Sequence, residues 1–192
     1  MTLNRTALKV SLLSTLALAS PGVTAAEGHG HGHDHEMRQH GAHVHGIAAL
    51  NLALEGDEVH VELDTPAANI VGFEHVPSSE AEHVALDRAV ATLKDGDQLF
   101  RFNVEAGCRM AEAKVNSALL DEAHGHEVHA GETHSDIDAV YRFECDQPGK
   151  LTQLTVELFD AFPGMGELNI QYITEHKQGA AELTPANHVL GF

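Results

Sequence analysis

The sequence contains no tryptophan, and aromatic residues make up only 5% of its 192 positions. Basic residues are scarce as well: 11 Lys and Arg stand against 29 Asp and Glu, which gives a formal net charge of −18. A surface that stacks nucleobases or sugars needs aromatic rings, and binding to nucleic acid or anionic lipid needs clustered Lys and Arg. The composition therefore argues against nucleic acid and anionic membranes as partners and favours cations.

Motifs of common hydrolases are missing too. The chain has neither the H-E-x-x-H pattern of zinc peptidases nor the G-x-S-x-G turn of serine hydrolases. A catalytic zinc hydrolase needs only three protein ligands and an activated water, so this class stays open as an alternative. We expect a binding protein and not an enzyme.

The chain also lacks a long hydrophobic run, and its one apolar stretch lies near the N-terminus. Arg5 and Lys9 precede the apolar residues 10–18, and small residues follow up to Ala26. About 20 apolar residues are needed to span a bilayer, roughly twice the length of this run. Residues 1–26 are therefore predicted to be a secretory signal peptide, with the remaining chain in a Gram-negative-type periplasm and not inserted in the membrane.

Only two cysteines are present, Cys108 and Cys145. In an oxidising compartment an even pair is interpreted first as a disulfide. Closing this loop would stabilise the fold by about 3–4 kcal/mol in the chain-entropy model. The alternative is a pair of thiolate metal ligands, and the first interpretation predicts a structural role.

Two segments have no core-forming pattern. Residues 27–36 read EGHGHGHDHE, and residues 121–135 combine four His with four acidic residues and a few small apolar ones. Such segments cannot bury enough surface to offset the entropy of ordering them. We expect a flexible His-rich tail at 27–39 and a mobile His/Asp/Glu-rich loop at 121–135. They would flank a first β-rich lobe at 40–120 and precede a second at 136–192.

Both lobes show alternating strands around a turn. The paired strands are residues 44–54 with 59–63, and residues 141–145 with 154–158. A capping box at Ser79 and Glu82 predicts a helix in the first lobe, which Gly96 can end. Each lobe then returns to a strand, at 100–104 and at 168–172. The pattern predicts an α+β fold of two similar lobes of antiparallel sheet with helices, related by internal duplication.

Sixteen histidines are the outstanding feature. Neutral imidazole is the commonest metal ligand and suits zinc, copper and nickel. A flexible chain that carries alternating His can wrap several ions loosely, with fast exchange. The members of this predicted loose pool are His29, His31, His33, His35, His124, His126 and His129.

An ordered site is predicted where histidines lead into the first strand. If this strand begins by Ala42, His43 and His45 point to the same face, about 6–7 Å apart, which suits two ligands of one tetrahedral ion. The further candidate ligands are His40, His75, His134 and His176.

Several segments together resemble the ZrgA-type family of periplasmic zinc-binding proteins. They are RQHGAHVHG with the strand that follows it, TPAANIVGFEH, the region of Cys108, and HSDIDAVYRFEC. The resemblance covers nearly all of the chain after the predicted signal peptide. It implies a β-rich, two-lobed α+β fold, a His-rich variable insert and a role that supports zinc uptake. The resemblance further implies that His43, His45, His75 and His134, which lie in the matching segments, are candidate zinc ligands.

We therefore expect a protein that captures scarce Zn²⁺ and holds it or passes it on. Its expected partners are zinc ions and a zinc-uptake transporter or its binding protein. The ordered site would retain the ion, and the loose pool would collect it. A copper or nickel chaperone or resistance protein is the alternative, because imidazole binds copper strongly. Copper proteins generally recruit thioethers, however, and Met37, Met110 and Met165 form no cluster in the sequence.

Overall fold

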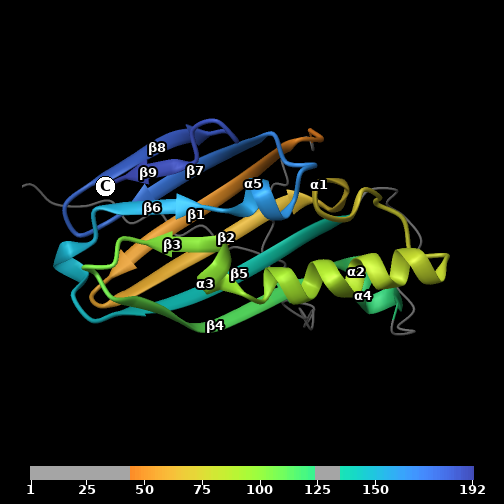
Figure 1. The fold of residues 1–192 in the computed structure, drawn as a ribbon, viewed down its shortest axis with the longest axis horizontal. Coiled ribbons are helices and arrows are strands. Elements are labelled where there is room, and N and C mark those ends of the chain that lie inside the picture. The colour runs from red at the N-terminus through yellow and green to blue at the C-terminus, as the bar shows by residue number, and fades with distance from the viewer. Residues whose placement is uncertain (1–43, 124–134) are drawn as a thin grey trace, which may run out of the picture. The chain divides into compact units, whose positions relative to one another are not determined.

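The computed structural model describes residues 44–123 and 135–192, all within one compact unit that spans His40–Phe192. The predicted signal peptide, the predicted tail and most of the 121–135 segment lie outside the described residues. The described strands form a six-stranded and a three-stranded sheet (Figure 1). In order across it, the six-stranded sheet holds β4 (Cys108–Asn116), β5 (Asp136–Cys145), β2 (Glu58–Pro66), β1 (Ile47–Glu55), β7 (Glu167–Ile173) and β8 (Gln178–Leu183).

The three-stranded sheet has the order β3 (Phe100–Phe102), β6 (Gln153–Val156) and β9 (Val189–Gly191). The described helices are α1 (Ala67–Val71), α2 (Glu80–Leu93), α3 (Gly96–Leu99), α4 (Ala118–Ala123) and α5 (Leu158–Ala161), with a 3₁₀ turn at Pro148–Lys150. None of the helices in the described ranges is long and apolar enough to cross a membrane.

The first predicted hairpin is confirmed. β1 and β2 pair antiparallel, from Glu55 opposite Glu58 to Ala49 opposite Asp64. Val59, Val61 and Leu63 are fully buried or nearly so, as their alternation predicts. The strand β1 nevertheless begins at Ile47, after a turn in which the Ile47 N–H donates to the Val44 carbonyl at 3.0 Å. The strand geometry predicted for His43 and His45 is therefore wrong for His45, which precedes the strand.

The second predicted hairpin is wrong. β5 pairs with β2 and β4 in the large sheet, whereas β6 pairs with β3 and β9 in the small one. Tyr141 and Phe143 of β5 are fully buried, and their rings contact Phe100 of β3 edge-on, with centroids 4.9 and 6.2 Å apart. β5 and β3 thus face each other across the core, because each buries its apolar face there.

The two segments predicted to form similar lobes contribute strands to one sheet. Residues 40–120 contribute β1, β2 and β4 to the large sheet, and residues 136–192 contribute β5, β7 and β8 to the same sheet. β1 even pairs in parallel with β7. The proposed counterparts 100–104 and 168–172 lie in different sheets, so the internal duplication is not confirmed. The β-rich character with few helices agrees with the prediction.

One face of the six-stranded sheet carries the core. The small sheet, α2 and α3 cover that face (Figure 1). Leu86, Ala89 and Leu93 are the buried residues of α2. The predicted capping box of this helix is confirmed, since Ser79 Oγ accepts from the Glu82 N–H at 3.3 Å and Glu82 Oε2 accepts from the Ser79 N–H at 3.0 Å. The helix ends at Leu93 and not at Gly96, which begins α3.

The predicted disulfide is confirmed. Cys108 of β4 lies directly opposite Cys145 of β5, and their sulfurs are bonded at 2.04 Å. Sulfur atoms in this bond are not thiolates, so the alternative of two thiolate ligands does not fit the structure. The bond joins the edge strand of the sheet to its neighbour and has a structural role.

Candidate metal centre

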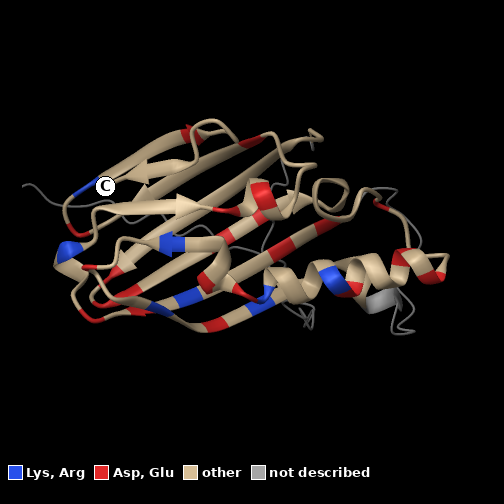
Figure 2. Cartoon of the chain, in the orientation of Figure 1, with Lys and Arg blue, Asp and Glu red and all other residues tan. Residues whose placement is uncertain are grey.

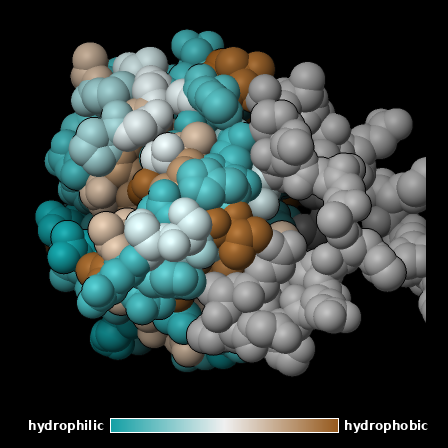
Figure 3. Space-filling view, turned by 90° about the vertical axis from the view of Figure 1, so that its right-hand side faces the viewer, coloured by the Kyte–Doolittle hydropathy of each residue, from teal (hydrophilic) through white to brown (hydrophobic). Residues whose placement is uncertain are grey.

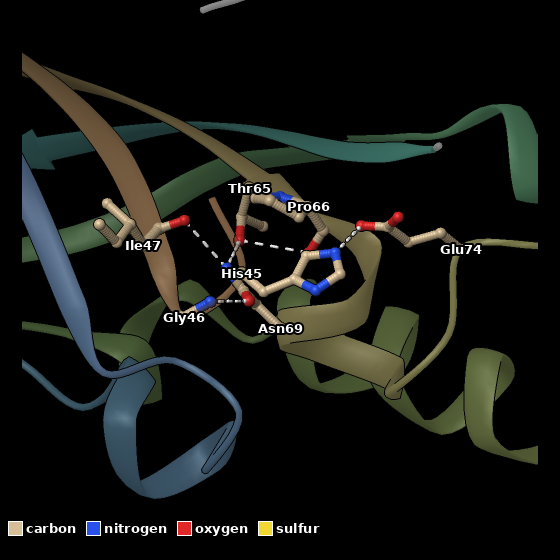
Figure 4. A network of polar contacts seen from close by, with 7 residues as sticks. All are labelled: His45, Gly46, Ile47, Thr65, Pro66, Asn69 and Glu74. Atoms are coloured by element: carbon tan, nitrogen blue, oxygen red, sulfur yellow. Dashed lines mark hydrogen bonds and ion pairs between the residues drawn. The ribbon is translucent and has the colours of Figure 1, made fainter. Parts of the chain in front are cut away.

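A buried asparagine organises the entry to β1. Asn69 of α1 is 3% exposed, and its amide oxygen accepts from the Gly46 N–H at 2.6 Å. The amide nitrogen donates to the Ile47 carbonyl and to Thr65 Oγ1, both at 3.0 Å (Figure 4). Buried polar groups are costly unless they are paired, and here the pairing fixes the backbone that follows His45.

The segment that leads into β1 is also held by the start of β7. The Gly46 carbonyl accepts from the backbone N–H groups of Gly166 and Glu167, at 2.7 and 2.9 Å. Gly46 has φ 88°, which favours glycine. A side chain at Gly164 would place its Cβ 2.6 Å from the Asn69 carbonyl oxygen, so only glycine fits there without a shift. The segment before β1 is thus held between α1 and the start of β7.

The side chain of His45 projects from this fixed entry. Its Nε2 lies 2.9 Å from Oε1 of Glu74, as Figure 4 shows. The histidine side chain is 65% exposed, whereas the Glu74 side chain is only 10% exposed. Glu74 reaches this position because Gly72, which follows α1 and caps its C-terminus, has the left-handed conformation (φ 85°) and turns the chain. The result is an accessible imidazole against a largely buried carboxylate.

A second histidine–carboxylate pair follows directly in the sequence. His75 Nε2 lies 3.2 Å from Glu82 Oε1. The other oxygen, Oε2, accepts from the Ser78 N–H at 2.8 Å, from Ser78 Oγ at 3.0 Å and from the Ser79 N–H at 3.0 Å. These hydrogen bonds, with the Ser78 N–H first, lower the pKa of Glu82 to about 2. The carboxylate that caps α2 therefore also faces an imidazole.

Both pairs lie at one end of the large sheet. The start of β1, α1 and the first turn of α2 gather there (Figure 1). The chain also returns to the described body at this end, since the Ser135 carbonyl accepts from the Ala67 N–H at 2.9 Å and Asp136 lies opposite Pro66. Figure 3, which views this end, shows a mostly hydrophilic surface with separate apolar side chains. The side chains of His45 and His75 are 65% and 58% exposed there.

The structure places only some of the predicted ligands. His45 and His75 lie at the end just described. His176 follows β7, which runs parallel to β1, so it lies at the opposite end of the sheet, and its N–H contacts Thr174 Oγ1 at 3.4 Å. The remaining predicted ligands lie outside the described residues: His29, His31, His33, His35, His40, His43, His124, His126, His129 and His134.

Within the described ranges, no group of three His, Cys, Asp or Glu side chains is placed to hold a metal ion together. The described residues at this end of the sheet instead supply two histidine–carboxylate pairs, His45 with Glu74 and His75 with Glu82. His43 and His134 stand next in the sequence to Val44 and Ser135, the first described residues after each gap.

Sequence reasoning missed the residues that hold the histidines. The capping box predicted Glu82, but not its contact with His75, and Glu74 stands beside His75 without any pattern that marks it. Asn69 lies in the matched segment TPAANIVGFEH, where its polar side chain in an apolar context was the available signal. Contacts between residues 29 positions apart, such as His45 with Glu74, have no local signature.

A family model described as "ZrgA family zinc uptake protein" matches residues 42–192. The match includes every described residue and both histidine–carboxylate pairs. No curated protein matches the chain with significant similarity.

Proposed function

Because the chain belongs to the ZrgA family of zinc uptake proteins, we propose that it captures scarce Zn²⁺ in the periplasm and supports its uptake. The observation that carries the proposal is two imidazoles within the matched region that are each oriented by a carboxylate, His45 before β1 and His75 before α2. Imidazole nitrogen is a ligand that zinc prefers, and protein zinc sites generally use four ligands. The proposed role is binding and delivery, not catalysis.

The proposed ordered site uses His45 and His75 together with His43 and His134. The contacts with Glu74 and Glu82 support the choice of the first two, because zinc-binding histidines commonly donate their second ring N–H to a carboxylate. His43 and His134 are included because the chain beside each is fixed at the same end of the sheet. His40 is a further candidate, whereas the position of His176 argues against its membership.

A loose pool is proposed for the His-rich runs at 27–36 and 124–129. Alternating imidazoles with small or acidic neighbours can exchange one ion among several ligand sets. The chain's acidity supports collection, since a net charge of −18 raises the local concentration of cations. Figure 2 shows Asp and Glu on strands and helices alike, with few Lys and Arg between them. From this pool the ion would move to the ordered site and then to a transporter or its binding protein.

The test is a zinc titration of the chain from residue 27 onward by calorimetry, with ions counted by native mass spectrometry. We expect His43→Ala with His45→Ala to weaken the tightest site at least tenfold. The matched control is His60→Ala with His188→Ala, two half-buried histidines on other parts of the body, and it should leave that site unchanged. Unchanged zinc affinity in the His43/His45 variant would remove the pair from the site. Copper in the same titration tests the copper-chaperone alternative, which tight copper binding with weak zinc binding would favour.

A further inference from the structure

We infer that Glu74 and Glu82 are positioning residues that fix the imidazoles of His45 and His75 so that each presents Nδ1, and not Nε2, to the metal. The inference rests on the proposed function, because it names the ligand atoms of that site. It goes further in assigning roles to two carboxylates that need not touch the ion.

The first step is the chemistry of the pair. A carboxylate in its ionised form can only accept hydrogen bonds. The ring nitrogen that faces it, Nε2 in both histidines, must therefore carry the proton. In a neutral imidazole the other nitrogen then holds the lone pair, and a metal binds through that lone pair. The two contacts thus decide which atom is the ligand.

The second step is the surroundings of that atom. In Figure 4 the second ring nitrogen of His45 points away from Glu74. Within the part of the chain that the structure describes, Nδ1 of neither His45 nor His75 makes a hydrogen bond. The histidine side chains are 65% and 58% exposed, so both rings lie largely in solvent.

The third step is the rigidity of the carboxylates. Glu82 divides its oxygens: Oε2 accepts three hydrogen bonds from Ser78 and Ser79 at the start of α2, and Oε1 is left for His75. Glu74 is held by burial, with only 10% of its side chain exposed. Each imidazole is therefore oriented by a group that the fold has already fixed, which lowers the cost of ordering a ligand.

Other histidines of the body lack this arrangement. His60 Nε2 lies 3.3 Å from Glu58 Oε2, but this contact is an ion-pair distance without hydrogen-bond geometry, and Glu58 Oε1 pairs with Arg142 at 2.8 Å. His188 uses Nδ1 itself, which lies 3.2 Å from the Pro185 carbonyl. A carboxylate hydrogen-bonded to Nε2, with Nδ1 left without a hydrogen bond among the described residues, distinguishes His45 and His75 from His60 and His188.

The test is nitrogen NMR of ¹⁵N-histidine-labelled protein loaded with ¹¹³Cd²⁺ as a probe for zinc. Signals of His45 and His75 are assigned by their loss in His45→Ala and His75→Ala. We expect ¹¹³Cd–¹⁵N coupling at Nδ1 of both rings. Glu74→Ala should allow coupling at Nε2 of His45 and weaken zinc binding tenfold to a hundredfold. The control is Glu62→Ala, which removes one exposed carboxylate from the outer sheet face and should change neither readout.

Two further measurements distinguish a loss of zinc binding from a loss of the fold. Glu74→Gln keeps the side-chain volume, and the melting temperature of each metal-free variant reports on the fold. Coupling at Nε2 in the unsubstituted protein, or unchanged zinc affinity in a folded Glu74→Ala, would overturn the inference. If His45→Ala and His75→Ala themselves leave zinc affinity unchanged, the proposed site fails first. If they weaken binding while the coupling is at Nε2, only the assignment of the ligand atom fails.

Discussion

The amide oxygen of Asn69 accepts a 2.6 Å hydrogen bond from the backbone N–H of Gly46, the residue that follows His45. One buried side chain in α1 thereby sets where the first strand begins and where the histidine before it is placed. The position of the candidate site thus depends on a residue that has no ligand chemistry of its own.

Asn69→Ala should lower the free energy of unfolding by about 2–4 kcal/mol, because it leaves the Gly46 N–H and the Ile47 carbonyl without this partner. The same variant should weaken zinc binding. Urea denaturation of the metal-free protein measures the first effect. Asn169→Ala is the control, since the side chain of this exposed asparagine donates to Glu167 Oε1 at 3.0 Å on the surface, and its loss should cost less than about 0.5 kcal/mol. Equal effects in the two variants would contradict the anchoring role of Asn69.

Tyr141→Phe should leave the protein as stable as before or stabilise it by about 1 kcal/mol. The ring of Tyr141 is fully buried, and in the described structure its hydroxyl has no hydrogen-bond partner. Burial raises the pKa of this hydroxyl, in keeping with an apolar environment. Removing an unpaired buried hydroxyl removes its desolvation cost. Thermal unfolding compared with Tyr172→Phe, at a half-buried ring, checks this, and a loss above about 1 kcal/mol would show that the hydroxyl is paired.

Lowering the pH should weaken the hydrogen bonds of Glu82 at the start of α2 only below about pH 4.5. The lowered pKa of Glu82, about 2 against an ordinary 4.5, means that its ionised form stabilises the folded chain. This contribution is complete above about pH 4.5 and disappears as the pH falls towards 2. The difference in unfolding free energy between metal-free wild type and Glu82→Gln should therefore narrow across this window. A difference that stays constant from pH 6 to 2 would mean that the charge of Glu82 contributes nothing.

Deleting residues 27–36 and replacing residues 124–132 with a short Gly-Ser linker should lower the number of zinc ions bound. The tightest binding event and the fold should remain, because the residues of the described core belong to neither segment. Native mass spectrometry gives the ion count, and calorimetry gives the affinity of the tight site. Loss of the tightest event in a folded deletion variant would place the ordered site in the His-rich runs.

Local pattern alone determined several features of this protein. The alternation of Val59, Val61 and Leu63 predicted a strand with one buried face, and the spacing of Ser79 and Glu82 predicted the start of a helix. The pair of cysteines, together with the secretion predicted from residues 1–26, predicted the disulfide, and the motifs predicted the family that the match over residues 42–192 shows. Each of these depends on residues near in sequence or on the mere presence of a residue type.

The tertiary structure decided which strands pair and what surrounds the histidines. A period of two tells which face of a strand is buried but not which strand lies beside it, so β5 joined β2 and β4 instead of the predicted hairpin with β6. In the same way His45 was identifiable as a ligand candidate, whereas its contact with Glu74 and the support from Asn69 were not. Hydrogen bonds between distant segments form only where packing of the whole chain brings donor and acceptor within about 3 Å, and no local pattern encodes that distance.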